Sequence, residues 1–88
     1  MSVENILDER GSKYGKFENH ASISQGLKLV INAELEQRNK KLSDDQQEAL
    51  EMICHKIARI INGDQNYADS WVDIAGYATL IAIRLNQK

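Results

Sequence analysis

Eleven residues, Arg10–His20 (RGSKYGKFENH), combine the side-chain types that bind phosphorylated ligands. They include two glycines, two aromatic rings, three cations and a histidine. An aromatic ring can stack on a base, lysine and arginine can neutralise phosphates, and glycine lets the backbone come close to a ligand. This mixture indicates a small phosphorylated, ring-bearing ligand. The alternative is a solvated connector between two helices.

Carboxylates that hold magnesium are the second chemistry that the sequence permits. Two pairs lie at helical spacing: Glu48 with Glu51, and Asp69 with Asp73. Facing carboxylates of this kind hold Mg²⁺ against a nucleotide's phosphates in all-α nucleoside-triphosphate pyrophosphohydrolases. Those enzymes carry an EExxE run followed by ExxD, whereas this chain has only ExxE and DxxxD. We therefore expect the glutamates to be solvated and the aspartates to pair with Lys56 or Arg59.

The remaining histidines and the cysteine do not complete a catalytic or metal site. His55 follows Glu51 by one helical turn, but one histidine and one carboxylate do not make a zinc site, so a structural histidine is expected. His20 is isolated in the sequence and could cap a helix or contact a ligand. Cys54 lacks a recognisable catalytic partner, and GxSxG, GxxxxGK[ST] and GxGxxG motifs are absent from the sequence. The sequence predicts no catalytic residue, no bound metal and no cofactor.

Polar side chains farther along the chain could complete a binding site with the Arg10–His20 stretch. They are cations, an aromatic ring and amides: Lys28, Arg59, Tyr67, Asn62 and Asn66. Lys28 lies beside the apolar stripe of a long helix. A phosphate brought by a ligand or by a neighbouring subunit would explain a cation there, and a snorkelling surface lysine is the alternative.

Four helices are predicted to position these residues, because helix formers are abundant and proline is absent. The first is a short helix at Val3–Glu9 that Gly11 ends, and the others are long, at about Asn19–Gln37, from Ser43 to Gly63 and at about Tyr67–Asn86. A capping box of Ser43 and Gln46 marks the start of the third helix, and Asn66 is expected to cap the fourth. Gly63 is expected to close the third helix as a left-handed C′ residue.

Each long helix carries an apolar stripe at helical spacing. The stripes are Ile23, Leu27, Val30, Ile31 and Leu35, then Leu50, Ile53, Ile57, Ile60 and Ile61, then Trp71, Ile74, Ala78, Ile81 and Leu85. The fourth helix has a second face of small or apolar residues, so we expect it to lie between two partners, one of them from another subunit. Burial of this helix within its own monomer is the alternative.

Composition predicts one all-α domain over residues 1–88, with a short N-terminal helix and antiparallel long helices in an oligomeric bundle. The formal net charge is −2 with cations and anions interspersed, so the chain lacks the basic face that binds DNA or RNA. Neither a signal peptide nor an apolar run of membrane-spanning length is visible, so a soluble protein is expected. The single cysteine, Cys54, fits a reducing cytoplasm and is expected to be a buried small hydrophobe.

Three runs of the sequence resemble a family of small phage proteins. The runs are ILDERGSKYGKFENHASISQGLK, LSDDQQEALEMICHKIARIINGD and YADSWVDIAGYATLIA, with the motifs ERGSxYGxF, HKIxRIxNGD and DSWxDIxGY. The family consists of cyclic-nucleotide sponges, the second type of anti-CBASS protein, which inhibit the bacterial immune system CBASS by sequestering its second messengers. The likeness extends from about Ile6 to Leu85.

The resemblance implies an all-α hexamer of interlocked dimers in the host cytoplasm. Cyclic dinucleotides such as 3′,3′-cGAMP would bind between protomers without being cleaved, and cyclic trinucleotides would bind at separate pockets. Tyr14 matches the aromatic residue that stacks on the bases, and Lys28 matches the lysine that meets the phosphates. Proximity adds Arg10, Gly11, Lys13 and His20 to this site, and Arg59 with Asn62 is proposed for the trinucleotide.

Two other functions remain open at the level of sequence. A Mg²⁺-dependent pyrophosphohydrolase would use the four carboxylates named above and would turn nucleotides over. A protein-interaction module would act through the fourth helix and would bind no nucleotide.

Overall fold

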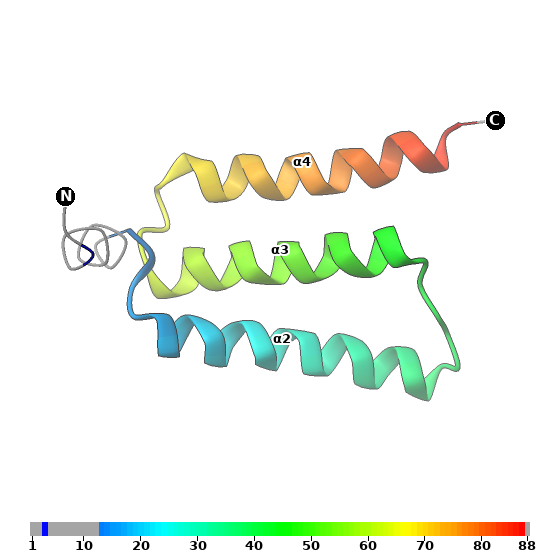
Figure 1. Ribbon diagram of the computed structural model, residues 1–88, viewed down its shortest axis with the longest axis horizontal. Helices are drawn as coiled ribbons and strands as arrows, with labels where there is room; N and C mark the ends of the chain where they lie inside the picture. Colours follow the sequence, from blue (N-terminus) through cyan, green and yellow to red (C-terminus); the bar gives the residue numbers. More distant parts are fainter. Residues whose placement is uncertain (1–2, 4–12, 88) are drawn as a thin grey trace.

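The computed structural model describes Val3 and residues 13–87, in which three long α-helices and no strand are found. α2 spans Phe17–Gln37, α3 spans Asp44–Asn62 and α4 spans Ala68–Leu85. The prediction of an all-α fold with antiparallel long helices is confirmed (Figure 1). The short helix predicted at Val3–Glu9 lies outside the described residues except for Val3, and so do Arg10 and Gly11.

The three helices lie side by side in one layer, with α3 between α2 and α4 (Figure 1). α3 packs against both neighbours, whereas α2 and α4 do not pack against each other. A closed three-helix bundle would bring those two outer helices together around a core. The open layer instead leaves the broad faces of α3 without a covering helix from the described part of the chain.

Little apolar surface is buried in this layer. Among the described residues, the buried hydrophobic side chains are Ala49, Cys54 and Ala58, all on α3, so the prediction for Cys54 is confirmed. Several residues of the predicted stripes are exposed instead: Val30, Leu50, Ile61, Trp71 and Leu85. These residues stay exposed because a helix in a single layer covers only the part of its apolar face that meets a neighbour.

α4 is an outer helix of the layer. Ser70 is its one buried residue, and Trp71, Val72, Leu80 and Ile83 are 56–64% exposed. Burial of this helix within its own monomer, the alternative left open by the sequence, is therefore wrong. Its contact with another subunit stays a prediction.

Local sequence signals identify most helix ends. α3 starts after Ser43, whose backbone N–H donates to Gln46 Oε1 at 3.0 Å, so the capping box is confirmed. α2 begins two residues earlier than predicted. The residue before α4 is Tyr67 rather than Asn66, because the Asn66 backbone N–H donates to Asp64 Oδ1 (2.9 Å) in the turn.

Gly63 closes α3 as expected, but for a different physical reason. Its φ of −125° lies outside the left-handed region. A Cβ at this position would stand 2.1 Å from the Lys13 carbonyl oxygen and 2.4 Å from Tyr14 Cα. Glycine is therefore needed because the segment before α2 crosses directly over the end of α3.

Candidate functional site

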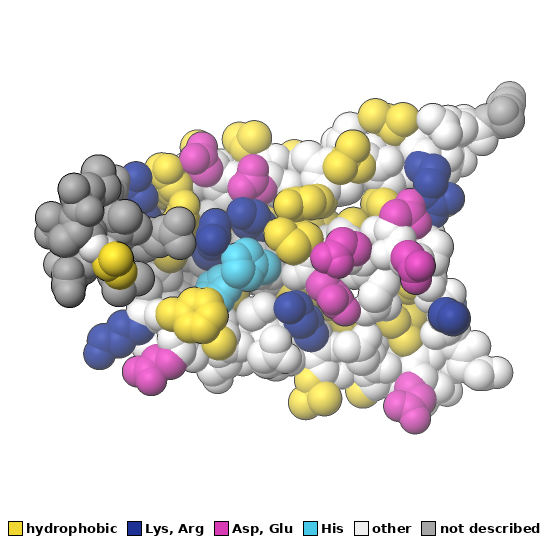
Figure 2. Space-filling view, viewed as in Figure 1, with side chains coloured by type: hydrophobic (Ala, Val, Ile, Leu, Met, Phe, Trp, Pro, Cys, Tyr) yellow, Lys and Arg dark blue, Asp and Glu magenta, His cyan; other side chains and the backbone are white. Residues whose placement is uncertain are grey.

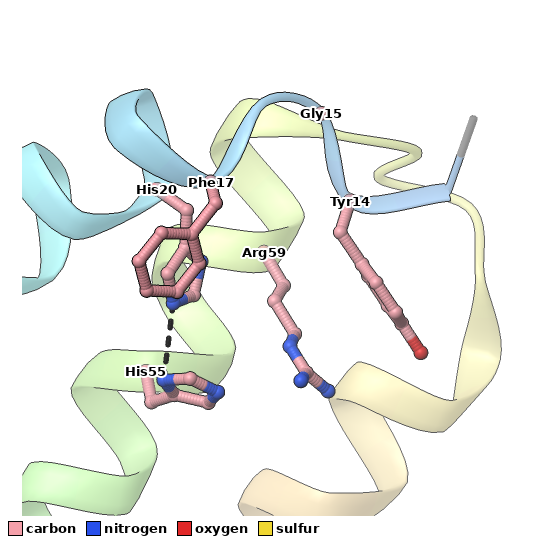
Figure 3. A pocket seen from close by; sticks show the side chains of 6 residues that line it. All are labelled: Tyr14, Gly15, Phe17, His20, His55 and Arg59. Atoms are coloured by element: carbon pink, nitrogen blue, oxygen red, sulfur yellow. Dashed lines mark hydrogen bonds between the residues drawn. The ribbon is translucent and has the colours of Figure 1, made fainter. Parts of the chain in front are cut away.

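A groove runs between the first half of α2 and the second half of α3, and two adjoining pockets form it. The first, of about 130 Å³, is lined by Tyr14, Gly15, Phe17, His20, His55 and Arg59 (Figure 3). The second, of about 100 Å³, shares Phe17, His20 and His55 and continues along α2 to Lys28. We call this surface the histidine groove. Figure 2 shows both histidines side by side on one face, with a hydrophobic ring and several Lys or Arg side chains around them.

The segment that leads into α2 is fastened to the C-terminal end of α3. Asn62 donates both side-chain N–H groups, to the carbonyl oxygens of Tyr14 and Lys16, each at 2.9 Å. Gly15 allows this contact, because it has φ +77° and because a Cβ there would lie 2.3 Å from the Asn62 carbonyl oxygen. Asn62 and Gly15 thus set the position of Tyr14 at one end of the groove.

Tyr14 is packed against a cation and a second ring. The guanidinium carbon of Arg59 lies 4.3 Å from the centroid of the Tyr14 ring. Tyr67 meets Tyr14 edge to face at 6.0 Å, and Lys13 Nζ lies 4.9 Å from the centroid of Tyr67. Cation–π contacts of this kind orient the guanidinium without using its hydrogen-bond donors, which remain available to an anion.

Two histidines occupy the middle of the groove. His20 Nε2 and His55 Nδ1 lie 3.0 Å apart, so that one ring donates a hydrogen bond to the other (Figure 3). The two rings meet edge to face, and Phe17 stacks on the other side of His20 with centroids 5.9 Å apart. His20 is 5% exposed, whereas Phe17 is 78% exposed. The Phe17 ring therefore presents an uncovered surface at the mouth of the groove.

Burial and positive charge both keep the histidines neutral. Burial is the largest cause that lowers the pKa of His55, to about 4, followed by His20, Arg59, Lys56 and Lys28. Burial also lowers the pKa of His20, again with contributions from Arg59, Lys28 and Lys56. At neutral pH the groove thus combines two uncharged imidazoles with the side chains of Arg59 and Lys28.

None of the four carboxylates lines this groove, and they do not form a metal site. Lys56 Nζ pairs with Asp73 Oδ2 at 3.0 Å, so the predicted ion pair is confirmed for Asp73. For Asp69 it is wrong, because that carboxylate accepts a hydrogen bond from the Tyr67 hydroxyl at 3.0 Å. Glu51 accepts from Gln47 and is half-buried rather than solvated. Within residues 13–87, no group of three or more His, Cys, Asp or Glu side chains could hold a metal ion.

The structure brings four of the predicted ligand-binding residues to the histidine groove: Tyr14, His20, Lys28 and Arg59. Asn62 does not line the groove but donates hydrogen bonds to the segment before α2. The ammonium group of Lys13 lies over the Tyr67 ring. Arg10 and Gly11 lie outside the described residues.

Sequence reasoning missed two ring side chains of the groove, Phe17 and His55. It paired His55 with Glu51 one turn away, whereas the structure pairs it with His20, 35 positions earlier in the chain. One signal could have placed His20 correctly. It precedes Ile23 and Leu27 by three and seven residues, which puts it on the face of α2 that packs against α3.

The fold and the groove define a small all-α protein with a single layer of helices and a cationic, aromatic binding surface. The chain belongs to the DUF6378 family, described as a domain of unknown function, which matches residues 2–84. No curated protein and no solved structure matches the chain significantly. In the part of the chain that the structure describes, no helix has the length and apolar character needed to cross a membrane.

Proposed function

We propose that the protein binds and sequesters cyclic dinucleotide second messengers such as 3′,3′-cGAMP, and thereby prevents activation of CBASS effectors during phage infection. The observation that carries this proposal is the alternation of rings and cations along one groove. Tyr14 and Arg59 lie at one end, Phe17 lies at the centre, and Lys28 lies at the other end. A cyclic dinucleotide presents two bases and two phosphates in a compact ring, and it needs stacking surfaces and cations at close range.

The groove supplies both kinds of contact. Stacking of a base on an aromatic side chain is worth about 1–3 kcal/mol, and Tyr14 and Phe17 offer two such rings. Charge-assisted hydrogen bonds from Arg59 and Lys28 to phosphate oxygens are about twice as strong as neutral ones. Arg59 lines one of the two adjoining pockets and Lys28 lines the other, so each cation could meet one phosphate.

A second copy of the chain is part of the proposal. Large apolar side chains on α4 remain exposed, and one broad face of the layer carries the open groove. We propose a homo-oligomer, a hexamer of interlocked dimers as the family resemblance implies, in which another protomer covers the groove and slows ligand release. Cyclic trinucleotides would bind elsewhere between protomers. In this arrangement the protein acts in the host cytoplasm.

Sequestration is favoured over hydrolysis because Asp73, one of the four carboxylates that a metal site would need, is already in an ion pair. Asp73 is held by Lys56, so Mg²⁺ at Asp73 would have to displace or tolerate an ammonium group at 3.0 Å. The exposed face of α4 is also what a protein-interaction module would present. The proposal assigns that face to assembly of the protein itself.

A capture-and-release experiment tests the proposed function. The full chain is mixed with 3′,3′-cGAMP and Mg²⁺, freed of unbound ligand and heat-denatured, and the supernatant is separated by HPLC. We expect intact cyclic dinucleotide at near-stoichiometric yield. Linear or shortened products would instead make the protein an enzyme, and a protein that neither retains nor consumes the ligand would be an interaction module.

A further inference from the structure

We infer that the His20–His55 pair binds a phosphate of the ligand as an imidazole–imidazolium pair, and that ligand binding takes up a proton from solvent. This inference rests on the proposed function and adds to it. It assigns a phosphate-binding role to His55 and a second, protonated state to the pair. Three features of the groove carry it: the geometry of the pair, the charges around it and the position of Arg59.

The geometry leaves one ring nitrogen of His55 for a ligand. Its Nδ1 is engaged with His20 Nε2 at 3.0 Å, and Figure 3 shows the other nitrogen, Nε2, on the side where Arg59 lies. His55 lines both pockets of the groove. A phosphate between Arg59 and His55 would therefore meet Nε2 directly.

The protonation state decides whether His55 attracts or repels that phosphate. In the neutral pair, one of the two rings donates the shared hydrogen bond. If His55 donates from Nδ1, its Nε2 carries a lone pair and repels a phosphate oxygen. If His20 donates from Nε2 instead, the Nε2 of His55 already carries a hydrogen, and it can donate to a phosphate without adding positive charge. One additional proton on the pair makes Nε2 an N–H donor in either arrangement and adds a positive charge. The protonated pair is thus the form that both donates from Nε2 in either arrangement and attracts an anion through its charge.

The surrounding charges explain why the proton arrives with the ligand. Arg59, Lys28 and Lys56 disfavour an extra positive charge on the histidines while the groove is empty of anions. In the described part of the chain neither histidine bonds to a carboxylate. Asp73 on α4 forms an ion pair with Lys56, and Glu51 accepts a hydrogen bond from Gln47. A bound phosphate supplies the missing negative charge and reverses the balance.

The same charges argue against a metal ion at the pair. Two imidazoles can bind a transition metal, but a divalent cation there would face three permanent cations and would lack a third protein ligand among the described residues. An anion meets no such repulsion. The charge of the groove therefore favours an anion over a metal ion.

Calorimetry with the full chain tests the inference. The enthalpy of 3′,3′-cGAMP binding is measured at pH 7.0 in PIPES, ACES and imidazole buffers, whose ionisation enthalpies differ. We expect a buffer-dependent enthalpy that reports uptake of about half a proton to one proton per ligand. We also expect affinity to rise as the pH falls from 8 to 6, with an upper limit of about tenfold per pH unit. Binding without a buffer-dependent enthalpy would overturn the inference and leave the proposed function standing.

Two substitutions test whether the proton taken up on ligand binding is bound by the His20–His55 pair. His55→Gln keeps a neutral hydrogen-bonding side chain, so it should retain weaker binding and lose the proton uptake. Lys28→Ala should weaken binding and keep the proton uptake, because the pair remains intact. Equal uptake in wild type and in His55→Gln would overturn the inference.

A spectroscopic titration covers the case in which His55→Gln does not fold. The pKa values of both histidines in the wild-type protein are followed by NMR with and without ligand, and we expect one of them to rise in the complex. Unchanged values in a complex that forms would reject the inference. Absence of any complex at all would reject the proposed function together with it.

Discussion

The guanidinium of Arg59 lies against the ring of Tyr14, with its carbon 4.3 Å from the ring centroid, although the two residues are 45 positions apart in the sequence. The contact joins the segment before α2 to the last turns of α3. It places a stacking surface and a phosphate-binding cation next to each other at one end of the histidine groove.

Replacing Tyr14 by alanine should weaken binding of 3′,3′-cGAMP by about 5-fold to 150-fold, the range that corresponds to one lost base stack of about 1–3 kcal/mol. Tyr14→Phe should bind almost as wild type, because stacking requires the ring and not the hydroxyl. Calorimetry measures the affinities, and thermal unfolding shows whether the variants stay folded. Wild-type affinity in Tyr14→Ala would remove the residue from the site.

Lys28→Ala should weaken the same ligand by about tenfold or more and should reduce the salt dependence of binding, because one charge-assisted phosphate contact is lost. Lys40→Ala is the matched control, since Lys40 is an exposed lysine in the connection between α2 and α3. Binding is measured at low and high salt. Equal losses in the two variants would indicate a general charge effect rather than a contact at the groove.

Gly63→Ala should destabilise the protein and weaken ligand binding, because the new methyl group would meet the Lys13 carbonyl oxygen at 2.1 Å and push the segment that carries Tyr14 off α3. Gly26→Ala is the opposite case. Gly26 lies inside α2 with nothing within 4 Å of an added Cβ, so alanine should stabilise the helix by about 0.5–1 kcal/mol. Urea unfolding of both variants checks the signs. A neutral Gly63→Ala would show that the close contact can relax freely.

Local structure was predictable because its causes lie within a few residues of each other. The capping box at Ser43 marks the start of α3, and spacing alone identifies its apolar stripe. Gly63 was placed correctly at the end of α3, although the contact that requires a glycine there comes from the distant segment before α2. The same local reasoning placed the N-cap of α4 at Asn66, one residue before the observed N-cap, Tyr67. The backbone N–H of Asn66 instead donates to Asp64 in the preceding turn.

The open layer and the histidine pair were not predictable in this way. Periodicity shows which face of a helix is apolar, but it does not show whether another helix of the same chain covers that face. Val30 and Ile61 are exposed for this reason. The contact of His20 with His55 depends on the register between α2 and α3, which neither helix encodes alone.

The stability of the protein without ligand should fall as the pH drops from about 7 to about 4. The pKa of His55 is lowered to about 4 in the folded protein, mainly by burial, whereas the unfolded chain takes up this proton near pH 6.5. The unfolded state therefore binds more protons throughout this window, and protonation favours unfolding. Urea titrations at several pH values measure the slope. His55→Gln should show a shallower slope, and an identical slope would mean that His55 does not control acid stability.

Assembly should depend on the apolar side chains of α4 that the layer leaves exposed. Leu80 and Ile83 are 64% and 56% exposed, so glutamate at either position costs little within one chain but would bury a charge in a contact between chains. Light scattering after size exclusion should give several chains per particle for wild type and a lower mass for Ile83→Glu, with the helical circular dichroism retained. Gln37→Glu, at the exposed end of α2, adds the same single negative charge and is the control. Since another protomer is proposed to cover the groove, Ile83→Glu should also release cyclic dinucleotide faster. A wild-type protein that runs as a single chain and still retains the ligand would contradict the proposed assembly and leave the histidine groove as a complete site in one protomer.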